Sequence, residues 1–174
     1  TPDADLKMTI MGTVFGAVGT CGQRCTSTRR LIVHEDIYEN VKNSLVKAYD
    51  QIKIGNPLDS NNHVGPLIDI KAVESYNDAI SKVNNQGGSW LVKGGILEGD
   101  EYSSGCYVKP AIAEVNHSLE IVHQETFAPI LYLIKYKGDV RNAIDIQNEV
   151  DQGLSSAIMT NNLKESELFL SHQG

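Results

Sequence analysis

Short apolar runs alternate along the chain with longer segments whose apolar residues recur every three or four positions. A spacing of three or four places apolar side chains on one face of a helix, whereas a short continuous apolar run favours a buried strand. The helical spacing covers residues 1–19, 37–52, 73–83, 139–146 and 163–171, and the apolar runs lie at 31–33, 90–92, 106–108, 127–136 and 157–159. This alternation predicts an α/β domain with a largely parallel sheet flanked by helices.

The ends of these elements carry local signals. Thr1, which precedes a proline, predicts the N-cap of the first helix, and Asp36 and Asp139 precede later helices in the same way. Residues 55–66 are rich in asparagine, glycine and proline, which predicts a surface loop. The run 130–134 is the most continuous apolar stretch, so it is the expected central strand.

Length and composition indicate one ordinary globular domain. The chain has 174 residues, of which 41% are hydrophobic and 21% charged, and residues 1–174 are therefore predicted to form a single domain with a sizeable core. No apolar run is long enough to span a bilayer, and the start is acidic where a secretory signal would be basic. The sequence predicts a soluble protein with no membrane partner. Because it opens in a helix cap without an initiating methionine, it is also expected to be a piece of a longer protein.

Charge and cysteine content argue against several functional classes. The formal net charge is -7, and the basic residues are scattered apart from Arg29 and Arg30, so nucleic acid is not an expected partner. Three cysteines without a framework spacing fit a reducing compartment such as the cytoplasm. No second pair completes a zinc site with Cys21 and Cys25, and no glycine-rich phosphate loop occurs. We therefore expect no bound metal.

Cys25 is the candidate nucleophile, because it follows two glycines and lies beside a cation in residues 19–26. The thiolate is the reactive form of cysteine, and a neighbouring positive charge such as Arg24 favours it. Glycines allow a substrate to approach the main chain closely. From these residues alone, the alternative that Cys25 is one more small buried apolar residue stays open.

Other chemistry in the chain is less distinctive. The sequence around Cys25 partly resembles the Gln-x-Cys of caspases, although Arg24 stands where that motif has alanine, so a cysteine protease is a weaker alternative. Most carboxylates fall in exposed positions of the predicted helices and loops. Glu125 differs, because it directly precedes the predicted central strand, a position near a crevice in many α/β sheets.

Six motifs resemble, in order and approximate spacing, those of the aldehyde dehydrogenase superfamily. They are GQRCT at 22–26, GNPLD at 55–59, GPL at 65–67, YVKP at 107–110, ETFAP at 125–129 and the segment 148–160. The sequence QRCT with Arg29 and Arg30, the alanine at position 128 and GLSS at 153–156 are most similar to the antiquitin branch, the α-aminoadipic semialdehyde dehydrogenases.

The resemblance implies the catalytic-domain fold of that family and NAD-dependent oxidation of an aldehyde, with NADP left open as the cofactor. It implies that Cys25 attacks the carbonyl to form a thiohemiacetal, that hydride passes to NAD, and that water cleaves the resulting thioester. It also implies that the backbone amide of Cys25 stabilises the charge on the former carbonyl oxygen.

The resemblance further assigns three binding residues. Glu125 matches a carboxylate that hydrogen-bonds the nicotinamide ribose, and Phe127 matches an aromatic residue beside the nicotinamide ring. Arg24 matches an arginine that, in the antiquitin branch, binds the distal carboxylate of the substrate, a task that suits a planar guanidinium.

The same family carries its general-base glutamate, its oxyanion asparagine and its dinucleotide-binding segment before the position of Thr1, and a substrate-anchoring loop and an oligomerisation strand after Gly174. The isolated chain is therefore expected to be inactive, and the parent protein to be a homo-oligomer. Two other functions stay open: a non-catalytic relative that serves as a binding module, and a thiol hydrolase or acyltransferase. The latter needs a histidine such as His34 or His123 beside Cys25.

Overall fold

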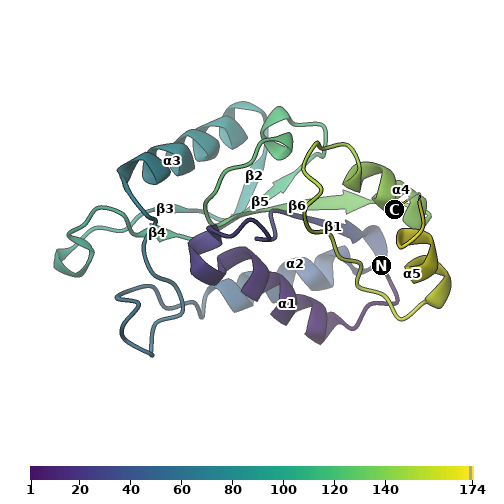
Figure 1. The fold of residues 1–174 in the computed structure, drawn as a ribbon, viewed down its shortest axis with the longest axis horizontal. Coiled ribbons are helices and arrows are strands. Elements are labelled where there is room, and N and C mark those ends of the chain that lie inside the picture. Colours follow the sequence, from purple (N-terminus) through teal and green to yellow (C-terminus); the bar gives the residue numbers. More distant parts are fainter. Residues whose placement is uncertain (173) are drawn as a thin grey trace.

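The computed structural model describes residues 1–172 and 174, and its helices lie on both sides of a central sheet (Figure 1). The helices are α1 (Leu6–Val18), α2 (Glu35–Tyr49), α3 (Ile70–Asn85), α4 (Val140–Gln147) and α5 (Leu163–Phe169). The strands are β1 (Arg30–His34), β2 (Ser89–Val92), β3 (Gly95–Ile96), β4 (Val108–Lys109), β5 (Ala111–Val115) and β6 (Ile130–Tyr136). Short 3₁₀ turns lie at Gly19–Gly22, Asp100–Tyr102 and Glu120–His123.

The main sheet has four strands in the order β1-β6-β5-β2. β6 pairs in parallel with both β1 and β5, and only β2 runs antiparallel to its neighbour β5. The consecutive residues Leu131, Tyr132 and Leu133 of β6 are at most 2% exposed, as a strand covered on both faces requires. The prediction of an α/β fold with a largely parallel sheet, and of a central strand within 127–136, is confirmed.

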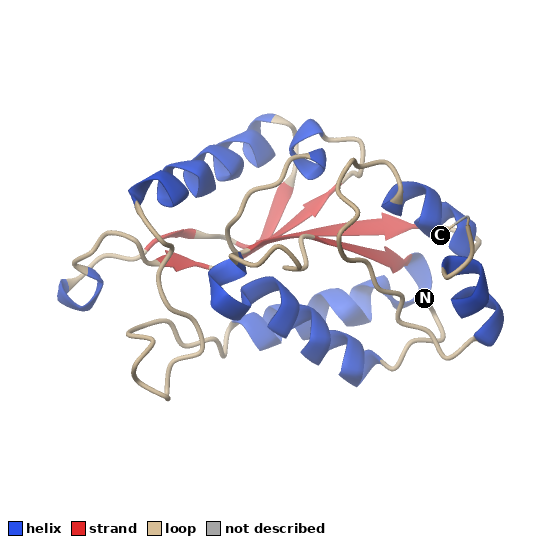
Figure 2. Cartoon of the chain, in the orientation of Figure 1, coloured by secondary structure: helices blue, strands red, loops and turns tan. Residues whose placement is uncertain are grey.

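Helices cover the sheet from both sides (Figure 2). α1 and α2 pack against each other and against β6, while α3 lies across the sheet from them. The predicted apolar stripe of α3 is buried at Val73, Tyr76 and Val83. The longest helix, α3, has 16 residues, and none of the helices in the described chain combines the length and apolar character that a membrane crossing needs.

The first helix starts later than the sequence predicts. Its N-cap is Asp5, whose carboxylate accepts a hydrogen bond from the Met8 amide at 3.0 Å, and α1 begins at Leu6. Thr1 cannot cap it, because its ammonium and hydroxyl groups are turned to the carbonyl oxygen of Met159. The prediction of Thr1 as the cap was therefore wrong, since a contact remote in sequence outweighed the local Thr-Pro signal.

Two strand predictions also differ from the structure. β5 was missed, because only the apolar run at 106–108 was predicted as a strand in this part of the chain, whereas the five residues after Pro110 pair with both β2 and β6. Residues 157–159 were predicted as a strand, but no strand is present there. The backbone of this segment instead contacts the amino-terminal residues, through Thr1 to Met159 and Asn161 to Asp3.

Candidate active site

A left-handed turn joins α1 to the segment that carries Cys25. Thr20, Cys21 and Gly22 have consecutive φ angles of 55°, 54° and 67°. Non-glycine residues disfavour this region by about 1–2 kcal/mol each, so the turn is held by its surroundings rather than by local preference. It leaves Cys21 only 1% exposed in the core and places Cys25 at the surface.

Two glycines bring the cysteine segment into close backbone contact with its supports. A Cβ atom on Gly22 would lie 2.6 Å from the carbonyl carbon of Ala128 and 2.7 Å from the nitrogen of Pro129. A Cβ atom on Gly16 of α1 would overlap the hydroxyl of Thr28. Because neither position leaves room for a side chain, the cysteine segment packs closely between α1 and the residues that lead into β6. The motif at 22–26 and the motif at 125–129 are therefore in direct contact.

Gln23 ties the same turn to a third motif. Its side-chain nitrogen donates to the carbonyl oxygens of Thr20 and Pro66, at 3.2 and 3.3 Å. Its side-chain oxygen accepts a hydrogen bond from the Ile68 amide at 2.8 Å. Because all three contacts are with backbone groups, Gln23 joins the loop at 65–68 to the cysteine turn whatever side chains that loop carries.

Arg29 connects the cysteine turn to the segment before β6. Its guanidinium donates to the carbonyl oxygens of Ser27, at 2.9 Å, and Arg24, at 3.1 Å, which lie on either side of Cys25. It also forms an ion pair with Glu125 at 3.3 Å and lies over the ring of Phe127, 5.1 Å from its centroid. Burial lowers the pKa of Arg29, while the charges of Glu125 and of the cysteine raise it.

A cavity of about 670 Å³ opens beside this arginine. Its lining includes Cys25, Arg29, Glu125 and Phe127, together with residues 152–159. Phe127 is 43% exposed as a residue, and the Glu125 side chain is 44% exposed. A volume of this size is typical of small-molecule and cofactor sites.

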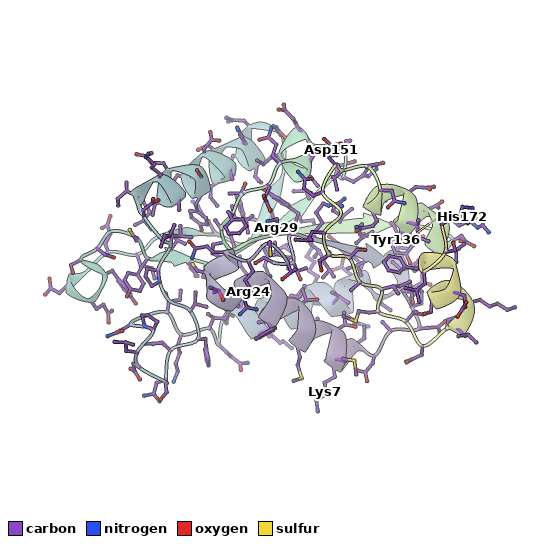
Figure 3. All side chains as sticks on the ribbon, viewed as in Figure 1. Lys7, Arg24, Arg29, Tyr136, Asp151 and His172 are labelled. Carbon is purple, nitrogen blue, oxygen red and sulfur yellow. The ribbon has the colours of Figure 1, made fainter. Side chains whose placement is uncertain are left out.

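Of the residues predicted for the site, the cavity brings together Cys25, Glu125 and Phe127 but not Arg24. The Arg24 guanidinium instead lies over the exposed ring of Phe15, 4.9 Å from its centroid, and donates to the Thr20 hydroxyl at 2.8 Å. Figure 3 shows it at the end of α1, whereas Arg29 lies over the sheet near the centre of the molecule. A substrate contact by Arg24 would therefore come from outside this cavity.

The histidines that a thiol hydrolase would need are engaged elsewhere. His34 bonds the Gly138 carbonyl through Nε2, at 3.1 Å, and accepts the Asp36 amide through Nδ1. Nε2 of His123 bonds the carbonyl oxygen of His117 at 2.7 Å. No histidine of the described residues lines the cavity that contains Cys25. The structure thus gives no support to a histidine-activated thiol.

Comparison with known protein families matches residues 1–172 to the "Aldehyde dehydrogenase family". The chain belongs to the aldehyde dehydrogenase family. The expectation drawn from the six motifs is confirmed at this level, and the match covers the left-handed turn, the cavity and the sheet together.

Curated relatives and solved structures agree with this membership. The chain is 46% identical over 158 residues to "Aldehyde dehydrogenase family 7 member A1" of Pisum sativum, and covers 30% of that protein with 91% of its own length. It is 44% identical over 162 residues to "Alpha-aminoadipic semialdehyde dehydrogenase" of Bos taurus, with 92% of this chain and 29% of that protein covered. The predicted likeness to the antiquitin branch is thereby confirmed. The chain spans about 30% of the length of these relatives.

Among solved aldehyde dehydrogenase relatives, the structure of 3,6-anhydro-L-galactose dehydrogenase in complex with NAP superposes with a TM-score of 0.94 and 28% sequence identity. The superposition covers 98% of this chain and 36% of that one. The catalytic-domain fold implied by the motifs is therefore confirmed.

The three cysteines are expected to differ sharply in reactivity. Burial raises the pKa of the Cys21 thiol to about 12, so at about pH 8 roughly one molecule in ten thousand carries that thiolate. Cys106 is also buried, and Cys25 is exposed. We expect iodoacetamide to modify Cys25 at least about tenfold faster than the other two at this pH. Peptide mapping by mass spectrometry over time measures the three rates, and equal labelling in the folded protein would contradict the expectation.

Proposed function

We propose that the full-length protein oxidises an aldehyde to the carboxylic acid, with Cys25 as the nucleophile and NAD as the cofactor. One observation carries this proposal: a single cavity is lined by the exposed cysteine, the Glu125 carboxylate and the Phe127 ring. Membership of the aldehyde dehydrogenase family supports it. NADP remains the alternative cofactor, and homo-oligomeric assembly of the parent protein remains a prediction.

The cavity residues fit a nicotinamide nucleotide. Glu125 pairs with Arg29 through Oε1, so its other oxygen can accept hydrogen bonds from ribose hydroxyls. Phe127 offers a partly exposed ring that can pack beside a planar heterocycle. When bound, the cofactor supplies an acceptor for hydride.

Cys25 is proposed to add its thiolate to the aldehyde carbon. A carbon–sulfur bond forms as the carbonyl electron pair moves to oxygen, and that oxygen becomes negatively charged. The backbone N–H of Cys25 donates no hydrogen bond within the described residues, which leaves it available to stabilise this charge. Loss of hydride from the same carbon leaves a thioester, and water then releases the acid and restores the thiol.

The proposed substrate is a semialdehyde that bears a carboxylate at its far end. The bovine relative is named for α-aminoadipic semialdehyde, and Arg24 supplies a cation one residue from the nucleophile. A guanidinium can bind a carboxylate through two parallel hydrogen bonds, but the ring of Phe15 and the Thr20 hydroxyl hold Arg24 in this structure. Arg24 would therefore have to leave part of that arrangement to reach a substrate.

The full-length protein and its Arg24→Gln variant test this function. Formation of reduced nicotinamide is followed by absorbance with NAD or NADP and two aldehydes of equal length, one with and one without a terminal carboxylate. We expect Arg24→Gln to raise the KM for the carboxylate-bearing aldehyde about tenfold or more and to leave that of the other within about twofold.

The isolated 174-residue chain is the negative control, since we expect it to form no reduced nicotinamide. The proposed function fails if the full-length protein oxidises no aldehyde with either cofactor. Equal changes in KM for both aldehydes would instead remove the role given to Arg24 and leave the reaction in place.

A further inference from the structure

Arg29 contacts both proposed cofactor-binding residues and the turn that carries Cys25. It binds the carbonyl oxygens that flank Cys25, pairs with Glu125 and covers part of Phe127. We propose that Arg29 is a positioning residue, which fixes Glu125 and Phe127 for nicotinamide binding and ties both to the turn that carries Cys25. This inference rests on the proposed function.

Glu125 and Phe127 need such a support because no regular structure holds them. Both lie in the irregular segment between the 3₁₀ turn Glu120–His123 and β6, and both are more than two-fifths exposed. The Arg29 side chain is only 17% exposed and is anchored to two backbone carbonyl groups. The anchored Arg29 guanidinium therefore limits the positions of the exposed Glu125 and Phe127 side chains.

The shape of the guanidinium allows these contacts to be made together. Its two terminal nitrogens serve the two carbonyl groups and the carboxylate, while its central carbon lies over the ring of Phe127, 5.1 Å from the centroid. An arginine that stacks on an aromatic ring also gains from attraction to the ring's electrons. Lysine would keep the charge, but its compact ammonium cannot keep the planar set of contacts.

The positive charge of Arg29 also helps to hold Glu125 in place. Arg29 is the ion-pair partner of Glu125, and removing it would leave this carboxylate beside the cysteine turn without its counter-charge. The carbonyl groups of Arg24 and Ser27 would lose their donor at the same time. A neutral replacement should therefore disturb the two proposed cofactor contacts before it disturbs the hydrophobic core.

The test uses the full-length protein and its variants Arg29→Gln and Arg29→Lys. The dissociation constant of NADH is measured by fluorescence titration, a readout that does not depend on turnover. We expect Arg29→Gln to raise this constant about tenfold, and Arg29→Lys about threefold. Arg141→Gln, at an exposed position on α4, is the matched control and should leave the constant unchanged.

A double-mutant cycle separates positioning from a purely structural role. In the Glu125→Gln background, the effect of Arg29→Gln on the NADH dissociation constant should shrink to about twofold, because the ion pair is already lost. A general weakening of the fold would raise the constant equally in both backgrounds, and would lower the thermal midpoint of both variants. If Arg29→Gln does not fold, Arg29→Lys in the same two backgrounds gives the comparison.

The outcomes distinguish this inference from the function on which it rests. If wild-type protein binds NADH and oxidises an aldehyde, an unchanged dissociation constant in Arg29→Gln, or an equal rise in both backgrounds, overturns the role of Arg29 alone. If wild-type protein binds no nicotinamide nucleotide, the proposed function falls and the inference falls with it. A tenfold rise in the NADH dissociation constant of Arg29→Gln that largely vanishes in the Glu125→Gln background supports both the proposed function and the positioning role of Arg29.

Discussion

Replacing Cys25 with serine in the full-length protein is expected to lower the rate of aldehyde oxidation by about a thousandfold or more. Serine keeps the size and position of the side chain, but its hydroxyl ionises far less readily than a thiol and is a much weaker nucleophile. No histidine of the described cavity is placed to activate it. The measurement is kcat from the formation of reduced nicotinamide at saturating aldehyde.

Two comparisons make the Cys25→Ser result specific. Cys106→Ser is the matched control, since Cys106 lies outside the cavity and its sulfur bonds the Ser104 carbonyl, a contact that a hydroxyl can replace. It should keep the wild-type rate. The dissociation constant of NADH should also be unchanged in Cys25→Ser, because the substitution removes the reacting atom and not the binding residues. A Cys25→Ser protein that retains its activity would remove the chemical basis of the proposed function.

Replacing Gly22 with alanine is expected to lower the free energy of unfolding by about 2–5 kcal/mol. The φ angle of 67° disfavours alanine by about 1–2 kcal/mol. The added methyl group would also lie 2.6 Å from the backbone of Ala128, an overlap that adds about 1–3 kcal/mol. Since relief of this overlap moves the cysteine turn away from Glu125 and Phe127, aldehyde oxidation should fall as well. Urea denaturation followed by circular dichroism gives the change in stability.

Gly87→Ala provides the control for the backbone conformation. Gly87 also has a positive φ, 87°, but a Cβ atom built on it meets nothing within 4 Å. This variant should lose only about 1–2 kcal/mol and keep its activity. Equal losses in the two variants would show that the contact between Gly22 and Ala128 contributes nothing to the turn.

The parts of the fold that the sequence predicts are those that depend on local patterns. The continuous apolar run at 130–134 identified the central strand, and Asp139 was confirmed as the N-cap of α4. The strand Ala111–Val115 was less visible, because its alanines and a glutamate resemble neither an alternating nor a β-branched run. This segment forms a strand because β2 and β6 pair with it on either side.

In the candidate site, too, the sequence predicts the residues that belong to local motifs but not the contacts between distant segments. Cys25, Glu125 and Phe127 were found from their motifs, but the sequence could not show that Arg29 joins them, since that depends on contacts between distant segments. Arg29 and Arg30 were visible only as a basic pair and as part of the resemblance to the antiquitin branch, with no role in the site given to either. Arg30 lines the same cavity, but its guanidinium donates to the carbonyl oxygens of Ile146 and Gln147 at the end of α4.

The parallel pairing of β1 with β6 also limits when the cysteine turn can form during synthesis. β1 ends at His34 and its partner begins only at Ile130, so the ribosome must make most of this chain before the two can meet. Contacts so distant in sequence form slowly, and unpaired strands attract other chains in the meantime. Until β6 emerges, a nascent chain thus carries Cys25 on a segment that lacks one of the supports of its turn. We expect newly made protein to depend on chaperones through that interval.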